Sequence, residues 1–184
     1  MTTIKQHIKA DLHRVYPGAF SYGKLLRGLR AKGFKYLFFL RLRNHSNPLI
    51  SWLAGLMKWI LTYRYGFQIP ASMKIGKGFF IGHFGSLVVS VHASFGENCN
   101  IAHNCTIGAS RGEKRQAPQI KDRVWIGTGA VLVGDIQVGP DVVIAPNAFV
   151  NFDVPPHSMV IGNPVKIIAK DNPTQKYINN AWMG

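Results

Sequence analysis

Residues 69–170 are dominated by a six-residue repeat, in which an aliphatic or aromatic side chain recurs at every sixth position. An α-helix repeats every 3.6 residues and a strand every two, so neither element alone produces this period. The pattern predicts a solenoid, in which each unit forms a short strand and a turn and three units close one triangular coil. The repeated positions fall in three frames: Ile69, Ile75 and Ile81; Val89, Phe95, Ile101 and Ile107; and Ile120, Ile126, Leu132, Val138, Ile144 and Val150.

Two shifts between these frames predict where the coils depart from a regular length. A two-residue insertion before Val89 lengthens one coil, and the thirteen-residue step from Ile107 to Ile120 leaves about seven residues for a projecting loop. The position four residues after each repeated residue is usually small or apolar. Cys99 and Cys105 occupy this position, so we expect both thiols inside the solenoid as small hydrophobic side chains.

The sequence before residue 68 is helical in character. Asn47 and Pro48 divide residues 22–64 into two segments, because proline interrupts a helix. The second segment, from Leu49 to Leu61, is strongly apolar but contains Lys58 and spans thirteen residues, whereas a helix that crosses a bilayer needs about twenty. We therefore expect a helical, basic region at residues 1–67, a β-helix at 68–170 and a C-terminal tail at 171–184.

Positive charge is concentrated in the N-terminal third of the chain. Residues 1–68 contain twelve Lys or Arg and a single acid, Asp11, so the net charge of +14 divides into +11 before residue 69 and +3 after it. Such a surface suits nucleic acid or an anionic membrane, and no nucleic-acid-binding motif accompanies the charge, so we expect no nucleic acid partner. The pattern favours a basic amphipathic helix pair that lies on a membrane or on another subunit. An ordinary helix pair with a solvated basic face stays open.

Composition gives a default location. The first twenty residues show no signal peptide, and two cysteines without a CxxC pair do not make a disulfide framework. We expect a globular protein in the reducing cytoplasm, with peripheral contact to the inner face of the bacterial inner membrane.

Two stretches of the repeat carry a family resemblance. The segments "VWIGTGAVLVGDIQVGPDVVIAPNAFV" and "VPPHSMVIGNPVKIIAK" resemble those of hexapeptide-repeat acyltransferases, which implies a left-handed parallel β-helix. The segment "IGKGFFIGHFGSLVVSVHASFGENCNIAHNCTIG" resembles the serine acetyltransferase branch, and within it the members found in polysaccharide loci. The resemblance implies a homotrimer in which acetyl-CoA and the acceptor meet between neighbouring subunits.

One histidine of the repeat is the candidate catalyst. His83 lies two residues after the inward-facing Ile81, so it points outward, and the lengthened coil places His103 beside it on the next coil. The resemblance aligns His83 with the general base, which takes the proton of a hydroxyl that attacks the thioester. Gly108 would then supply a backbone N–H to the oxyanion, and His103 would contact the acceptor. Alone, an outward histidine on a solenoid face is more often a surface or interface residue.

Three departures from the serine enzymes affect the expected acceptor. Gln68 stands where the family has the Asp that orients the catalytic histidine, and it could also be a solvated corner residue. Gly82 replaces the Asp that contacts the amino acid, and the projecting loop keeps Arg115 but lacks the family's loop histidine. Without a charge at Gly82 to hold an ammonium group, we expect a sugar hydroxyl in place of serine.

The resemblance also implies the coenzyme site. Small residues on the solenoid surface would line the pantetheine groove, where close backbone approach needs them, and two basic residues would meet the nucleotide phosphates. These are Gly127, Thr128, Gly129, Ala145 and Pro146, with Lys166 and Lys170 for the phosphates. Packing at the corners of the repeat is a second reason for the glycines.

The expected function is therefore acetyl-CoA-dependent O-acetylation of a sugar hydroxyl, on a capsular or exopolysaccharide or its lipid-linked precursor. One alternative is a serine O-acetyltransferase of cysteine biosynthesis, and another is a non-catalytic β-helix scaffold. A zinc-dependent β-helix carbonic anhydrase needs three histidine ligands, and the sequence lacks a pair of histidines five residues apart. We expect no metal.

Overall fold

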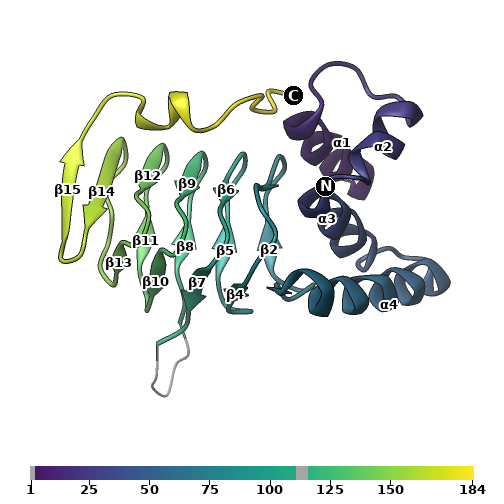
Figure 1. Ribbon diagram of the computed structural model, residues 1–184, viewed down its shortest axis with the longest axis horizontal. Helices are drawn as coiled ribbons and strands as arrows, with labels where there is room; N and C mark the ends of the chain where they lie inside the picture. Colours follow the sequence, from purple (N-terminus) through teal and green to yellow (C-terminus); the bar gives the residue numbers. More distant parts are fainter. Residues whose placement is uncertain (1–2, 111–115) are drawn as a thin grey trace.

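The computed structural model describes residues 3–110 and 116–184, and it shows a three-sided parallel β-helix with helices at one end (Figure 1). The strands form three sheets, one for each side. The first contains β1 (Phe67–Gln68), β4 (Leu87–Val89), β7 (Cys105–Gly108), β10 (Val131–Val133) and β13 (Phe149–Val150). The second contains β2 (Lys74–Ile75), β5 (Ser94–Phe95), β8 (Gln119–Ile120) and β11 (Gln137–Val138). The third contains β3 (Phe80–Ile81), β6 (Asn100–Ile101), β9 (Val124–Ile126), β12 (Val142–Ile144), β14 (Ser158–Gly162) and β15 (Val165–Ala169).

The strand register confirms the coil lengths that the sequence predicts. Phe67 pairs with Leu87, twenty residues on, and Leu87 pairs with Cys105 after the regular eighteen. Thr106 pairs with Val131, twenty-five residues on, so that coil has the seven extra residues that the sequence predicts. The last coil is shorter than predicted: β12 and β14 are sixteen residues apart.

The interior of the solenoid is filled by the repeated aliphatic residues. Ile81, Ile101, Ile126 and Ile144 stack in one column of the third sheet, and each is at most 3% exposed. The small positions are buried as well, including Cys99 and Cys105. Burial raises the pKa of Cys99 to about 12 and that of Cys105 to about 11, so both side chains are protonated packing groups at neutral pH.

The two ends of the solenoid are closed differently. The helical region covers the first coil, where the Tyr36 hydroxyl donates to the carbonyl of Phe67 at 2.9 Å. An antiparallel hairpin of β14 and β15 closes the other end. The chain then passes through a 3-10 turn, Pro173–Lys176, and runs back along the solenoid to end beside α1 (Figure 1). Trp182 donates its backbone N–H to Asn98 at 2.7 Å, which fixes this tail on the coils.

The helical region contains four helices where the sequence predicts two segments. They are α1 (Ile4–Val15), α2 (Tyr22–Gly28), α3 (Lys32–Leu42) and α4 (Pro48–Tyr65). The first predicted segment is broken after Gly28 into α2 and α3. Helix α1 begins with a capping box between Thr3 and Gln6, a spacing that is readable in the sequence. No helix in residues 3–110 or 116–184 is long and apolar enough to cross a membrane.

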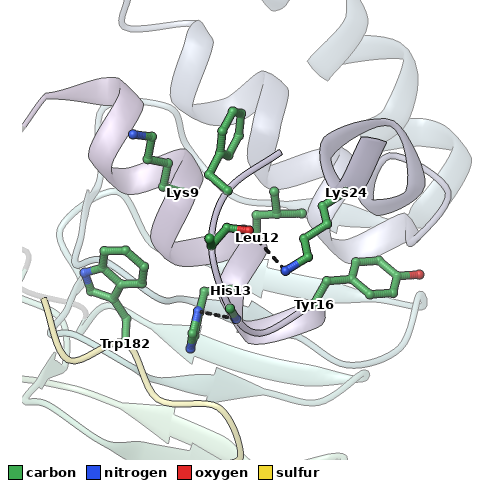
Figure 2. A pocket seen from close by; sticks show the side chains of 9 residues that line it. Lys9, Leu12, His13, Tyr16, Lys24 and Trp182 are labelled. Carbon is green, nitrogen blue, oxygen red and sulfur yellow. Dashed lines mark hydrogen bonds between the residues drawn. The ribbon is translucent and has the colours of Figure 1, made fainter. Parts of the chain in front are cut away.

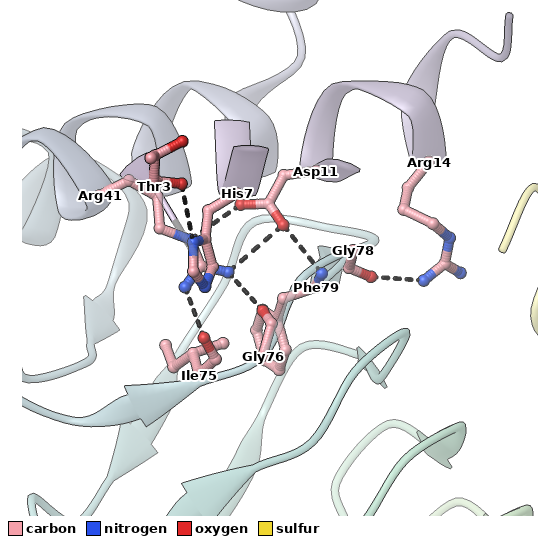
Figure 3. A network of polar contacts seen from close by, with 9 residues as sticks. All are labelled: Thr3, His7, Asp11, Arg14, Arg41, Ile75, Gly76, Gly78 and Phe79. Carbon is pink, nitrogen blue, oxygen red and sulfur yellow. Dashed lines mark hydrogen bonds and ion pairs between the residues drawn. The ribbon is translucent and has the colours of Figure 1, made fainter. Parts of the chain in front are cut away.

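A buried polar network joins the helices to the first coil (Figure 3). Asp11 and Arg41 form an ion pair at 2.9 Å, and Asp11 also accepts the backbone N–H of Phe79. Arg41 donates to the carbonyls of Ile75 and Gly76, each at 2.7 Å. Because all these groups find partners, the charges are tolerated inside the protein. The network fixes α1 and α3 rigidly on the coil that precedes His83.

Candidate active site

One edge of the prism carries most of the predicted site residues. The chain turns after each of the strands β3, β6, β9 and β12. The first backbone N–H of each turn donates to a carbonyl of the next coil. The donors are Gly82, Ala102, Gly127 and Ala145, at 2.8–3.3 Å from the carbonyls of Ile101, Ile126, Ile144 and Val160. These turns therefore stack in one column. We call residues 82–86, 102–104, 127–130 and 145–148 the histidine edge.

His83 and His103 lie next to each other on this edge, as their register predicts. Their ring centroids are 5.8 Å apart and the rings are nearly perpendicular. His83 is exposed, whereas His103 is partly covered. The Nδ1 of His103 is fully buried and has no hydrogen-bond partner among the described residues. The arrangement leaves the His83 imidazole free to meet a substrate.

The residues predicted to line the pantetheine groove continue the same column. Thr128 lies one coil beyond His103, and Pro146 one coil further, at about 4.8 Å per coil. Gly127 has no room for a side chain, because a Cβ there would lie 2.6 Å from the nitrogen of Pro146. Gly129 has φ +73°, which favours glycine. Corner packing and close backbone approach thus demand the same small residues.

The two predicted phosphate-binding lysines lie at opposite ends of β15. Lys166 pairs with Ile161, next to the turn that continues the histidine edge, so it lies at the end of that edge. Lys170 follows β15 and donates its backbone N–H to the carbonyl of His157, at the opposite border of the third sheet. The fold therefore brings Lys166 to the edge and leaves Lys170 four residues away along an extended strand, roughly 13 Å.

Gly108 is not beside His83 within one subunit. It ends β7, whereas the histidine edge precedes that strand, so the two lie at opposite borders of the first sheet. The segment in which the sequence predicts a projecting loop follows Gly108 directly in the chain. Arg115 belongs to this loop and lies outside the described residues. A site that uses both Gly108 and His83 would have to combine two subunits.

Gln68 does not orient the imidazole in this structure. It is exposed on β1 and pairs with Val88, five residues past His83. Within the part of the chain that the structure describes, no side chain hydrogen-bonds to His83. Gly82 is open to solvent and carries no group that could hold a charged acceptor.

Sequence reasoning missed a cation beside the turn that carries His83. The Lys32 ammonium lies 3.4 Å from the ring centroid of Phe84, which directly follows His83. This cation–π contact brings a positive charge from α3 to the histidine edge. Nothing in the local sequence could reveal it, because Lys32 and Phe84 are 52 residues apart and meet when α3 packs on the first coil.

One hollow near the helices is separate from this edge. A cavity of about 360 Å³ lies between α1, the segment that follows it and the C-terminal tail (Figure 2). Both lysine ammonium groups at this cavity already have partners. The Lys24 ammonium donates to the carbonyls of Pro17 and Ala19, and the Lys9 ammonium lies over the ring of Phe20. The described His, Cys, Asp and Glu residues form no group of three that could hold a metal ion.

The comparisons with known proteins agree on one family. Residues 117–151 match the family described as bacterial transferase hexapeptide (six repeats). The serine acetyltransferase of Helicobacter pylori strain 26695 is 34% identical over 120 residues, which cover 65% of this chain and 70% of that protein. The serine acetyltransferase of Mycobacterium tuberculosis is 38% identical over 111 residues, covering 59% of this chain and 48% of that protein.

Solved structures show the same likeness. A Neisseria gonorrhoeae serine acetyltransferase in complex with serine has a TM-score of 0.71 and 31% identity, covering 89% of this chain and 68% of that one. A Brucella abortus serine acetyltransferase in complex with coenzyme A has a TM-score of 0.76 and 26% identity, covering 91% and 68%. The likeness confirms the left-handed β-helix, and it extends over the helical region as well as the solenoid.

The expected sugar acceptor is therefore wrong. It was inferred from departures at Gln68, Gly82 and the projecting loop, whereas the likeness to serine acetyltransferases covers about nine tenths of the chain. Nothing here supports a glycan or lipid-linked acceptor. The scaffold alternative fails as well, since the relatives are serine acetyltransferases and one of them was solved in complex with coenzyme A. The chain is an acyltransferase that uses acetyl-CoA as its co-substrate, and it belongs to the serine acetyltransferase family.

Proposed function

We propose that this protein transfers the acetyl group of acetyl-CoA to the hydroxyl of L-serine. The observation that carries the proposal is the histidine edge, where an exposed imidazole and a column of small residues share one border of a prism that resembles serine acetyltransferases. The products would be O-acetylserine and free coenzyme A.

His83 would act as the general base. A hydroxyl is a poor nucleophile until its proton is removed, and a positioned base contributes about 10²–10⁴-fold to the rate. As the serine oxygen bonds to the thioester carbon, the imidazole takes its proton. The carbon–sulfur bond then breaks, and the imidazolium returns the proton to the departing sulfur of coenzyme A. The buried, protonated state of Cys99 and Cys105 argues against a cysteine acyl-enzyme.

The acceptor would be held by charge from the helical region. Serine brings a carboxylate, and Lys32 lies beside the turn that carries His83. An ammonium near this turn can bind a carboxylate without any contribution from Gly82. Gln68 is left without a direct role on the imidazole.

The complete site would form between subunits of a homotrimer. His83 and Gly108 lie at opposite borders of the first sheet, and cyclic symmetry places opposite borders of neighbouring copies together. The Gly108 N–H of one subunit would then stabilise the oxyanion that forms beside His83 of the next.

The test is release of free coenzyme A, followed with a thiol reagent. We expect turnover with acetyl-CoA and L-serine, and none with L-alanine, which differs from serine by the hydroxyl alone. Equal release with both amino acids would indicate hydrolysis. Absence of release with L-serine, from a folded protein that binds acetyl-CoA, would overturn the proposed acceptor.

A further inference from the structure

Helix α4 presents a long apolar stripe to the outside of the molecule. It runs along the border of the helical region, on the opposite side from α1 and α2 (Figure 1). Trp52, Trp59 and Tyr63 are 63%, 59% and 75% exposed. They belong to a set at helical spacing, in which every member is exposed: Leu49, Trp52, Leu53, Leu56, Trp59, Ile60 and Tyr63.

The opposite face of α4 already forms the contacts that hold the helix in place. Ala54, Leu61 and Tyr65 are buried against α3 and the first coil. The exposed stripe therefore adds nothing to the core of this subunit. An apolar surface of this length, exposed to solvent, indicates a site of contact with a membrane or another molecule.

The charge of the helical region indicates which kind of partner this stripe contacts. Of the twelve Lys and Arg in residues 1–68, Arg14 and Arg41 are buried, and the other ten are fully or partly exposed. The one acid of this region, Asp11, is 2% exposed and paired with Arg41. The described surface of the helical region therefore carries cations with no carboxylate of its own to balance them.

Basic side chains also flank the stripe itself. Arg43 borders a groove that Trp52, Leu56 and Trp59 line, and its guanidinium donates to Ser51 at 2.5 Å. Arg64 is exposed near the C-terminal end of the stripe. An apolar face rich in Trp, Tyr and Leu with basic residues beside it matches a helix that lies in the headgroup region of a membrane.

We propose that α4 docks this protein on the surface of an anionic lipid bilayer, with the stripe in the headgroup region and the flanking Arg43 and Arg64 facing acidic lipids. Tryptophan and tyrosine favour this interface because their rings are apolar and their N–H and O–H groups stay hydrated. A second copy of α4 is a poorer occupant, since pairing two helical regions would bring two unbalanced positive surfaces together. The inference does not depend on the identity of the acceptor.

The experiment measures co-sedimentation of the full chain with vesicles. We expect binding to vesicles of 70% phosphatidylcholine and 30% phosphatidylglycerol, and little binding to phosphatidylcholine alone. Raising NaCl from about 0.1 to 0.5 M should release most of the protein, because it screens the electrostatic attraction. A blue shift of tryptophan fluorescence should accompany binding.

Matched variants locate the surface. The double variant Trp52→Ser/Trp59→Ser should lower vesicle affinity at least about tenfold, since it removes the largest apolar groups of the stripe. Tyr22→Ser/Leu26→Ser, on the equally exposed surface of α2, should bind as the wild type does. Both should keep the melting temperature and acetyl transfer of the wild type.

Three results would overturn the proposal. The first is no binding to either vesicle, and the second is equal loss in the α2 and α4 variants. The third is a solution mass that falls when α4 is changed while vesicles remain unbound, which would make a second copy the occupant. Each result can occur with serine turnover intact, so failure here is distinguishable from failure of the proposed reaction.

Discussion

His83 and His103 are adjacent imidazoles with different surroundings, and their replacement should separate two roles. His83→Ala should lower kcat/KM by about 10²–10⁴, because it removes the proposed general base. His103→Ala should raise the KM for serine and leave kcat within about tenfold, since the ring borders the acceptor without taking its proton. Steady-state kinetics on both variants check this. Equal losses in kcat would make His103 part of the proton transfer.

Lys32 offers a second prediction, because it is the cation that the fold brings beside the catalytic turn. Lys32→Met should raise the KM for serine about tenfold or more, through loss of a charge-assisted contact to the carboxylate. The KM for acetyl-CoA should not change. Arg30→Met, an exposed cation just before α3, is the matched control. If the two variants behave alike, the effect is one of general charge and Lys32 has no specific role.

The residues of the site divide into those the sequence could reveal and those it could not. The pairing of His83 with His103 follows from counting residues in a repeat, because register in a solenoid is fixed by coil length. The separation of Lys166 from Lys170 could not be read from the repeat, because β15 reverses direction after the hairpin and the repeat pattern ends there. Lys32 was invisible, because its position depends on how α3 packs.

At the scale of elements, Asp141 connects the solenoid to the C-terminal tail. Its carboxylate accepts from His157 at 2.8 Å, from Arg123 at 3.1 Å and from the Thr174 hydroxyl. Burial acts to raise the pKa of Asp141, but these donors outweigh it and hold the pKa below its usual value. The contacts tie the 3-10 turn to the coil between β11 and β12.

Asp141→Asn should therefore destabilise the protein by about 1–3 kcal/mol at pH 7, because the buried Thr174 hydroxyl and the more exposed Arg123 and His157 lose a charged acceptor. A depressed carboxylate pKa stabilises the fold above the unfolded pKa, near 3.9, and this contribution disappears as the pH falls through the folded value. The melting temperatures of the variant and the wild type should thus converge below about pH 4. Asp171→Asn, at an exposed carboxylate, is the control. A difference that persists unchanged at pH 3 would contradict the ionic account.

The solenoid was predictable from the sequence and the helical region much less so. A six-residue period has one structural solution, and every inward position confirms it. The break after Gly28 depends on packing and was missed, whereas the capping box at Thr3 was readable in the sequence and was overlooked. The ion pair of Asp11 and Arg41 was also unpredictable, since it joins helices thirty residues apart through a coil that both contact.

At the scale of the whole molecule, the acceptor shows the limit of reasoning from single positions. Gly82 and Gln68 each lack a charge that the family uses, and they suggested a different substrate. The whole-chain likeness outweighs them, because about nine tenths of the fold, helices included, superimposes on serine enzymes. Lys32 brings a positive charge to the same edge from another element, which suits the carboxylate of serine but does not replace the negative charges that Gly82 and Gln68 lack.

Assembly gives the last prediction. If each site combines His83 of one subunit with Gly108 of its neighbour, light scattering should give a mass three times that of the chain. His83→Ala and Gly108→Val should each be inactive alone, the second because a Cβ at Gly108 would lie 2.9 Å from Cγ1 of Val133 and shift the backbone there. Refolding an equal mixture should restore about one quarter of wild-type activity, since one in four sites then receives both intact residues.

Three observations would contradict this assembly. Full activity of Gly108→Val would show that Gly108 is not part of the site. A monomeric wild type that turns over serine would show that no neighbouring subunit is needed. A mixture that stays inactive, although both variants form trimers, would show that His83 and Gly108 of neighbouring subunits do not share a site. In that case the border of the first sheet that carries Gly108 has a packing role, and the oxyanion must be met by an N–H of the histidine edge itself.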